Sequence, residues 1–127
     1  MDQSFKKIEK LKSEKLIEKL FSEGKSVAAY PLRLVYLKTD FEEPVKIKTG
    51  VSVSKRNFKT AVARNRLKRL MREAYRLNKS NYFNNISGQY AFMILYIGKT
   101  GTDFETISKK MNTLMDVFFK RQSLPKP

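Results

Sequence analysis

The chain of 127 residues contains no cysteine, no histidine and no tryptophan. The lack of cysteine excludes disulfide bonds, cysteine-ligated zinc and cysteine nucleophiles. Histidine is the commonest general base near neutral pH, so its absence removes the usual nucleophile–base pairs and a leading transition-metal ligand. The twelve acidic residues form no D-x-D-type cluster. We therefore expect no catalytic residue and no metal ligand in this chain, and we expect a partner to carry out any chemistry.

Long apolar runs are also missing. None approaches the roughly 18–20 residues that cross a bilayer, and residues 1–12 lack the apolar core of a signal peptide. We expect a cytoplasmic protein that does not span a membrane. The hydrophobic content of 41% and the chain length suit one packed domain. We predict a single domain over residues 1–127, with its core at about 13–121 and a short frayed tail at 122–127.

Positive charge is the most informative property that is present. Lysine and arginine number 27 against 12 acidic residues, which gives a net charge of +15 and a pI of about 10.1. Residues 55–79 hold ten of the cationic side chains and one acid, Glu73, so this segment contributes a net +9. Such a concentrated excess predicts a polyanionic partner, either a nucleic acid or an anionic membrane surface.

The apolar periodicity predicts three helices, over residues 13–23, 60–78 and 103–121. It predicts three strands, over residues 30–37, 45–54 and 89–97, of which the first can split in two at a bend. Residues 79–88 are rich in asparagine and serine, which is typical of a loop. Gly24 is placed to end the first helix, and Gly50 indicates a bulge or a close backbone approach in the second strand. This order predicts an α+β fold in which helices cover one sheet.

The helix predicted over residues 60–78 has two unlike faces. Its apolar stripe contains Ala63, Leu67, Leu70, Ala74 and Leu77. Its other face carries Asn65, Lys68, Arg69, Arg72 and Arg76, flanked by Arg64 and Arg66. Like charges four residues apart each cost a few tenths of a kcal/mol, and phosphate contacts would offset that cost. A solvated basic face usually intersperses acids, so we interpret this one as a nucleic-acid-binding surface.

Residues 51–76 have the sequence V-S-V-S-K-R-N-F-K-T-A-V-A-R-N-R-L-K-R-L-M-R-E-A-Y-R. This string resembles the signature of the bacterial ribonuclease P protein family, in which a strand ending in S-K-[KR] precedes A-V-x-R-N-R-x-K-R and then R-[EQ]. Arg64, Asn65 and Arg66 form the R-N-R. An F-x-x-G at Phe21 to Gly24 and the order of the other elements also fit the family. The resemblance covers about residues 13–121, and outside the signature it is mostly one of pattern.

The resemblance implies a single small α+β domain with a mixed sheet of about four strands, three helices and a left-handed βαβ crossover. It implies the protein subunit of the ribonucleoprotein that removes the 5′ leader from precursor tRNA. Catalysis and Mg²⁺ would then reside mainly in the RNA subunit. The implied partners are this catalytic RNA and the precursor tRNA, with no membrane partner. The implied assembly is a monomer in a 1:1 complex with the RNA.

The resemblance also implies two sets of site residues. The RNA-binding set comprises Lys55, Arg56, Arg64, Asn65, Arg66, Lys68, Arg69, Arg72 and Arg76. The cleft for the single-stranded leader comprises Ile17, Phe21, Tyr36, Ser52 and Ser54. Aromatic rings suit a single strand because every base offers a π-face. The placement of Tyr36 depends on strand register, since a slip of one residue would put Val35 in the cleft.

Two positions depart from the family pattern. Ile17 stands where an aromatic residue is usual, and residues 57–60 lack the glycine of the usual linker. For Ile17 and for Phe58, the sequence leaves open whether the side chain contacts RNA or only packs within the protein.

Three other functions share some of these features. A ribosomal protein or RNA chaperone would share the charge and the small fold, but the R-N-R string argues against it. A DNA-binding protein that uses the basic helix would need a dimer, and no dimer motif is present. A metal-dependent protein nuclease would need clustered carboxylates, which the sequence does not show.

Overall fold

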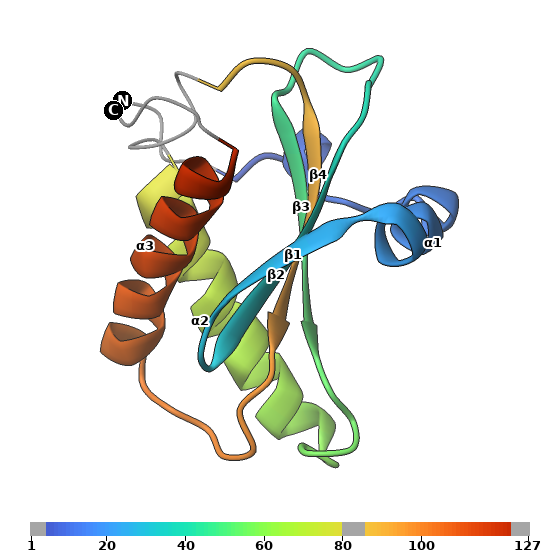
Figure 1. The fold of residues 1–127 in the computed structure, drawn as a ribbon. Coiled ribbons are helices and arrows are strands. Elements are labelled where there is room, and N and C mark those ends of the chain that lie inside the picture. Colours follow the sequence, from blue (N-terminus) through green and yellow to red (C-terminus); the bar gives the residue numbers. More distant parts are fainter. Residues whose placement is uncertain (1–4, 80–85, 123–127) are drawn as a thin grey trace.

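The structure is a computed structural model that describes residues 5–79 and 86–122. Most of the loop predicted at 79–88 and of the tail predicted at 122–127 lies outside these residues. The elements follow in the order η1 (Lys7–Glu9), α1 (Glu14–Glu23), β1 (Lys25–Ala29), β2 (Leu32–Lys38), β3 (Ile47–Val53), α2 (Ala61–Lys79), β4 (Tyr90–Tyr96) and α3 (Phe104–Arg121) (Figure 1). Each predicted helix and strand is present to within two residues at either end. The strand predicted over residues 30–37 does not split, and it forms β2. β1 lies before this predicted range and was not predicted, and the turn at Tyr30 and Pro31 joins the two strands.

A four-stranded mixed sheet has the order β1-β2-β4-β3. β1 pairs with β2, and β2 with β4, in antiparallel fashion, whereas β3 and β4 run parallel. Neighbouring parallel strands need a crossover connection, and α2 provides it as the helix of a βαβ unit. The predicted α+β domain with a mixed sheet and three helices is confirmed.

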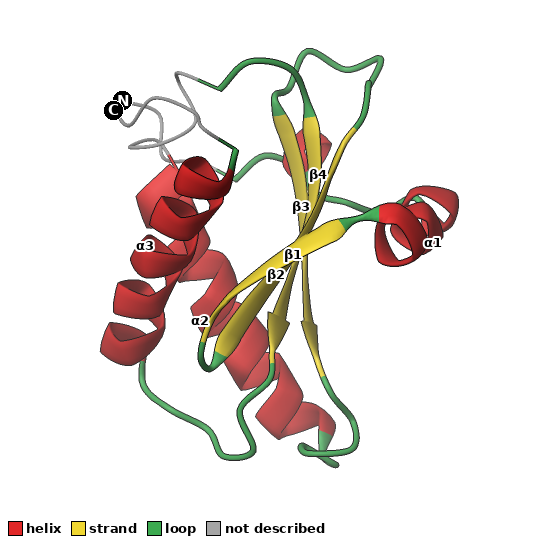
Figure 2. Cartoon of the chain, in the orientation of Figure 1, coloured by secondary structure: helices red, strands yellow, loops and turns green. Residues whose placement is uncertain are grey.

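The two faces of the sheet are covered unequally. α2 and α3 lie side by side on one face, and α1 crosses the other (Figure 2). The larger apolar core, on the α2 and α3 side, includes Leu34, Met71, Phe92, Ile94 and Phe118. A smaller cluster, on the α1 side, consists of Leu11, Leu20, Val35, Ala91 and Met93. Alternate residues of β4 point to opposite clusters, which explains why this strand is apolar along its whole length.

The register of β2 places Tyr36 in the larger core and away from α1. Tyr36 is 2% exposed, and its ring meets that of Phe118 edge to face with the centroids 4.9 Å apart. Its hydroxyl accepts a hydrogen bond of 2.8 Å from the Gln122 side chain. Val35, its neighbour in sequence, lies on the α1 side. The prediction that Tyr36 lines the leader cleft is therefore wrong, because side chains of a strand alternate between faces and the true register differs by one residue.

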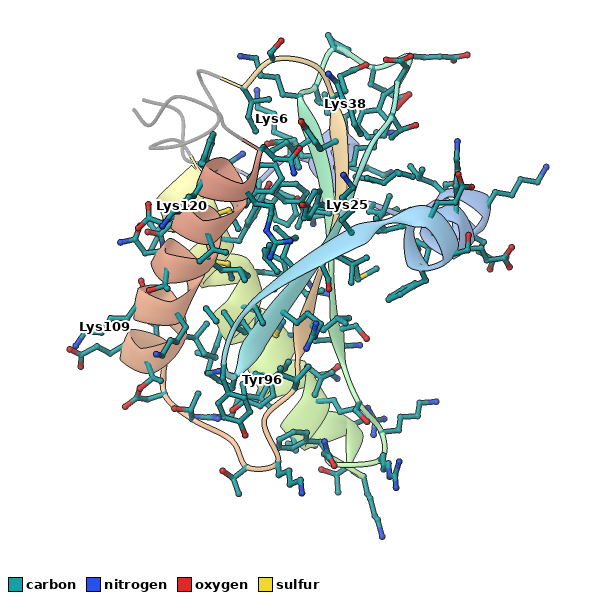
Figure 3. All side chains as sticks on the ribbon, viewed as in Figure 1. Lys6, Lys25, Lys38, Tyr96, Lys109 and Lys120 are labelled. Atoms are coloured by element: carbon teal, nitrogen blue, oxygen red, sulfur yellow. The ribbon has the colours of Figure 1, made fainter. Side chains whose placement is uncertain are left out.

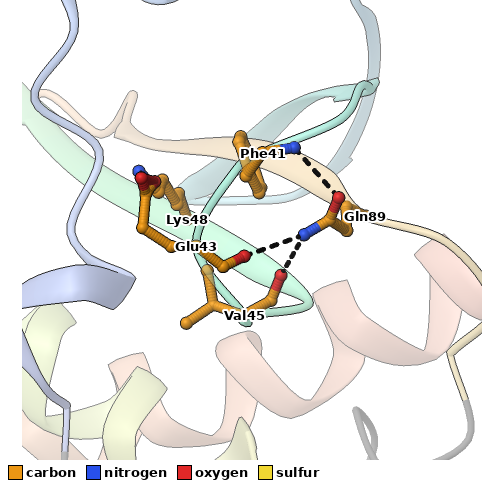
Figure 4. A network of polar contacts seen from close by, with 5 residues as sticks. All are labelled: Phe41, Glu43, Val45, Lys48 and Gln89. Atoms are coloured by element: carbon orange, nitrogen blue, oxygen red, sulfur yellow. Dashed lines mark hydrogen bonds and ion pairs between the residues drawn. The ribbon is translucent and has the colours of Figure 1, made fainter.

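The side chain of Gln89, the residue just before β4, holds the connection between β2 and β3 in place. Gln89 accepts a hydrogen bond from the Phe41 N–H (2.9 Å) and donates to the carbonyl oxygens of Val45 (2.7 Å) and Glu43 (3.2 Å) (Figure 4). Lys48 and Glu43 form an ion pair beside it, and the hydrogen bond from Lys48 lowers the pKa of the Glu43 carboxyl. Gln89 thus satisfies backbone groups that have no strand partner and helps to position the start of β3.

Two glycines permit close approaches between elements. Gly24 follows α1, and a Cβ there would lie 2.3 Å from the Leu20 carbonyl oxygen and 2.9 Å from that of Tyr36. The pairing of β3 with β4 continues through Gly50, so no bulge forms there. A Cβ at Gly50 would lie 3.0 Å from the terminal methyl carbon of Met93, and its nearest neighbours are side-chain atoms. The structure therefore shows close side-chain packing at Gly50 in place of the predicted backbone approach.

We expect Gly24→Ala to lower the free energy of unfolding by about 1–3 kcal/mol, because the added methyl group would overlap backbone that cannot move independently. Gly101→Ala is the matched control, since the nearest contact of a Cβ there would be Arg66 Nη1 at 3.8 Å. Urea unfolding followed by circular dichroism measures both variants. Equal stability of the two would contradict the close approach at Gly24.

Candidate nucleic-acid interface

The predicted basic helix is α2, and local hydrogen bonds close its first turn. The Thr60 hydroxyl accepts a hydrogen bond of 3.2 Å from the Ala63 N–H, and the Thr60 carbonyl oxygen accepts one from the Arg64 N–H. Thr60 therefore caps the helix by satisfying a donor that has no partner within it. Phe58, just before the cap, packs against Tyr96 with the ring centroids 5.7 Å apart. Phe58 therefore packs against the larger core and stays half-buried.

The buried face of α2 determines where its basic residues point. Leu67, Met71, Ala74 and Tyr75 are each at most 2% exposed and belong to the larger core. The predicted stripe contained Leu67 and Ala74 but omitted Met71 and Tyr75. The Tyr75 hydroxyl accepts a hydrogen bond of 2.7 Å from Thr49 on β3, and burial raises the pKa of this tyrosine. This packing holds α2 against the sheet with its polar face outward.

The polar face forms a surface that we name the basic ridge. Its members are Arg64, Asn65, Arg66, Lys68, Arg69, Arg72 and Arg76. Asn65, Arg66, Arg69 and Arg72 are exposed, and the other three are half-buried. The structure thus brings the predicted RNA-binding residues of α2 together on one surface outside the core.

Two arginines of the basic ridge are tied to loops. The Arg64 guanidinium donates a hydrogen bond to the Phe58 carbonyl oxygen (2.7 Å), and the Arg66 guanidinium donates one to the Thr102 carbonyl oxygen (3.2 Å). A guanidinium has five N–H donors, so each of these bonds leaves donors for a ligand. The loops therefore orient these side chains without using up their capacity to bind phosphate.

One ion pair interrupts the basic ridge. The Arg76 guanidinium donates two hydrogen bonds to the Glu73 carboxylate, one from Nε at 3.1 Å and one from Nη2 at 2.5 Å. The hydrogen bond from Arg76 lowers the pKa of Glu73, and the same bond raises the pKa of Arg76. Arg76, predicted as an RNA-binding residue, therefore already has a carboxylate partner in the free protein. The spacing of three residues between an acid and a base on one helix was the sequence signal for this pair.

Basic residues continue from the ridge into the loop between β3 and α2. Lys55 and Arg56 are exposed there, and the Arg56 N–H donates a hydrogen bond of 3.0 Å to the Ser54 hydroxyl. Ser54 is itself exposed at the end of β3. The loop therefore extends the basic surface from α2 to the end of β3. It carries the two predicted RNA-binding residues that lie outside α2.

The sheet face on the α1 side, which we name the open face, is only partly covered. Strand pairing places Arg33, Leu95 and Ser52 side by side across β2, β4 and β3, and all three are half-buried. The Arg33 guanidinium donates a hydrogen bond of 3.2 Å to the Ser26 hydroxyl on β1. Ser52, which the sequence predicted for the leader cleft, thus lies on the open face. Arg33 was missed, although an arginine within an apolar strand was a signal for it.

α1 borders the open face. Ile17 is half-buried and packs against the smaller cluster, so packing is the contact that the structure shows for it. Phe21 is 52% exposed, which is unusual for so large an apolar side chain. Of the five residues predicted for the leader cleft, Ile17, Phe21, Ser52 and Ser54 are compatible with a surface on this side, and Tyr36 is not.

Two exposed lysines of α3 belong to neither of these surfaces. Figure 3 shows Lys109 and Lys120 on α3 pointing outward from the molecule. Across residues 5–79 and 86–122, no three side chains of the kind that could jointly hold a metal ion come together. In the same residues, no helix combines the length and the apolar character that a membrane span requires.

A basic helix and a partly covered sheet face on one small α+β domain are typical of a nucleic-acid-binding protein. Comparison with known proteins identifies the family. The sequence model of the family described as Ribonuclease P matches residues 5–118. The chain is 40% identical over 111 residues to the ribonuclease P protein component of Porphyromonas gingivalis, covering 79% of each. It is 39% identical over 125 residues to that of Chlorobium phaeobacteroides, covering 88% of this chain and 86% of the relative.

Solved structures show the same fold. The RNase P protein from Thermotoga maritima superposes with a TM-score of 0.66 at 26% identity, covering 85% of this chain and 96% of that one. The Staphylococcus aureus RNase P protein superposes with a TM-score of 0.70 at 20% identity, covering 87% and 94%.

The chain belongs to the ribonuclease P protein family. Its role is that of the accessory protein subunit of ribonuclease P, an RNA-binding protein of tRNA processing, and its partner is the RNA subunit. These findings do not favour a ribosomal or RNA-chaperone function.

We expect Glu73→Gln to strengthen binding to a bacterial ribonuclease P RNA. The substitution removes the negative charge beside the basic ridge, and Arg76 can then direct to phosphate the donors that it gives to Glu73. The slope of log K against log salt should steepen by about one unit. Glu105→Gln, at an exposed site on α3, changes the net charge equally and serves as the control. Equal effects of the two variants in a filter-binding titration would show that net charge alone matters.

Proposed function

We propose that the basic ridge binds the catalytic RNA of ribonuclease P while the open face beside α1 binds the 5′ leader of precursor tRNA. The protein would then promote removal of the leader by adding a contact that precursor tRNA has and mature tRNA lacks. The observation that carries this proposal is the presence of two different surfaces, one basic and one mixed, joined by the loop with Lys55 and Arg56.

The chemistry of the basic ridge suits a structured RNA. Arginine binds phosphate with a planar fork and also stacks on bases, and it supplies five of the seven ridge residues. The ridge places like charges four residues apart along α2, and the phosphates of the partner would neutralise them. The bonds of Arg64 and Arg66 to nearby loops pre-orient two of these forks, which reduces the entropy that binding must cost.

The chemistry of the open face suits a single strand. Phe21 offers an exposed ring for stacking, and the row of Arg33, Leu95 and Ser52 offers a cation, an apolar surface and a hydroxyl. Such a mixture binds bases and backbone with little dependence on sequence. Arg33 therefore joins Phe21, Ser52 and Ser54 in the set that we propose for the leader.

The proposal assigns the catalytic metal to the RNA. The described carboxylates of the chain do not gather into a cluster that fits Mg²⁺, whereas phosphate oxygens hold this ion readily. The protein would support metal binding through its position at the interface. A monomer in a 1:1 complex is proposed because the described chain has one basic ridge and one open face, and the cytoplasm is the proposed location because bacterial precursor tRNA is made there.

The first test is multiple-turnover cleavage of a precursor tRNA at low Mg²⁺ by a bacterial ribonuclease P RNA with and without the protein. We expect the protein to restore cleavage at the mature 5′ end, since its cations replace part of the charge screening that Mg²⁺ provides. An unchanged rate, with the protein still bound to the RNA, would assign the basic ridge to another ribonucleoprotein.

We expect Phe21→Ala to reduce the ratio of affinities for precursor and mature tRNA by about fivefold or more, because base–aromatic stacking contributes roughly 1–3 kcal/mol per base. Phe21→Tyr keeps the ring and should preserve the ratio, whereas Phe21→Leu keeps only apolar volume and should not. Equilibrium titration of the reconstituted enzyme with both tRNAs measures the ratio. An equal loss of affinity for the two tRNAs would argue against a leader contact at Phe21.

A further inference from the structure

A pocket lies between the N-terminal segment, residues 5–12, and the basic ridge. Its volume is about 420 Å³. The segment contributes Phe5 and Lys10 to its walls, and α2 contributes Asn65, Arg69, Arg72 and the pair of Glu73 and Arg76. Neither Phe5 nor Lys10 belongs to the predicted RNA-binding set, because both precede the predicted core at 13–121.

Three contacts hold the N-terminal segment in place. The Phe5 ring meets Tyr75 of α2 edge to face with the centroids 5.4 Å apart. Glu9 forms a largely buried ion pair with Lys79 at the end of α2. The Leu11 N–H donates a hydrogen bond of 3.0 Å to the Thr49 carbonyl oxygen on β3. These contacts fix the N-terminal segment against α2 and β3 in the free protein. The pocket is therefore formed before RNA binds.

The walls of the pocket favour an anion. Lys10, Arg69, Arg72 and Arg76 supply four positive charges, and Glu73 supplies the one negative charge of the lining. Because Arg76 already binds Glu73, three cations are left to attract a ligand. Two of these are arginines, whose forks match the oxygens of a phosphate.

The walls also favour a base next to that anion. The Phe5 ring is half-buried, and the ammonium groups of Lys10 and Lys79 lie over it, 5.6 Å and 5.9 Å from its centroid. A phosphate that binds Lys10 would draw this ammonium away from the ring, and a base of the same nucleotide would then replace the cation on the aromatic surface. The Asn65 amide, which both donates and accepts, is available to a base edge or a ribose hydroxyl.

We propose that this pocket binds one unpaired nucleotide of the RNA subunit, with its phosphate between Lys10, Arg69 and Arg72 and its base against Phe5. The proposal rests on the proposed function, because it adds a contact to the same RNA interface. The volume lies near the lower end of the range of about 300–1,000 Å³ for small-molecule sites, which suits one nucleotide. A paired base would keep its face inside the helix, so the nucleotide must come from a loop, bulge or strand end.

The absence of tryptophan from the chain allows a direct test. Phe5→Trp introduces a single fluorescent reporter into the pocket, and Phe41→Trp introduces one in the β2–β3 connection, which does not line the pocket. Each variant is titrated with a bacterial ribonuclease P RNA in the absence of tRNA. We expect the RNA to quench Phe5→Trp with the same midpoint as binding and to leave Phe41→Trp unchanged. Binding that leaves both reporters equally bright, or quenches both equally, would overturn the stacking contact.

Two further variants test the energetics of the pocket. Phe5→Leu keeps apolar packing on Tyr75 but removes the ring, and we expect it to weaken RNA binding about fivefold or more while thermal unfolding stays cooperative. Lys10→Ala should weaken binding and flatten the salt slope by about one unit, whereas Lys109→Ala, of equal charge change on the outer side of α3, should not. Equal effects of the two lysine variants would overturn the proposal.

Arg66→Ala separates failure of the pocket from failure of the proposed function, because Arg66 belongs to the basic ridge but does not line the pocket. If Arg66→Ala weakens RNA binding while Phe5→Leu and Lys10→Ala bind like the wild type, the pocket proposal alone fails. If the wild type itself does not bind the RNA, the proposed function fails with it.

Discussion

The parallel pairing of β3 with β4 is the constraint from which the position of the basic ridge follows. Two parallel neighbours cannot be joined by a tight turn, so the chain must cross the sheet through a helix, α2. That helix becomes stable by burying Leu67, Met71 and Tyr75 against the sheet and α3. The residues on the opposite side of α2 therefore lie on the surface of the protein. The pairing that completes the sheet therefore also presents the arginines to a partner.

Unequal coverage of the sheet gives the molecule its second surface. β4 is apolar on both sides because α2 and α3 cover one face and α1 covers part of the other. α1 has only ten residues and packs mainly on Val35, Ala91 and Met93. The row of Arg33, Leu95 and Ser52 is left half-buried, which combines solvent access with a fixed backbone. A single strand can bind such a row without any rearrangement of the core.

Hydrogen bonds to two carbonyl oxygens and to one carboxylate partly offset the electrostatic repulsion within the basic ridge. Carbonyl oxygens of Phe58 and Thr102 accept bonds from Arg64 and Arg66, and the Glu73 carboxylate accepts both arms of Arg76. Exposed pairs of this kind contribute little to stability, so their main effect is to orient side chains. These hydrogen bonds therefore orient three arginine side chains of the basic ridge in the free protein.

Local patterns in the sequence determined the elements and the basic face of α2, because apolar periodicity and a helix cap such as Thr60 act within a few residues. The long string at residues 51–76, which includes the R-N-R, was sufficient to indicate the family. Long-range pairing decided the remainder. Only the partner strands of β2 determine whether Val35 or Tyr36 faces α1, since a shift of one residue exchanges the two faces. Only the packed fold brings Glu9 to Lys79, 70 residues away in sequence, and with it places Phe5 and Lys10 beside the basic ridge. Such contacts depend on the packing of whole elements, which no local pattern encodes.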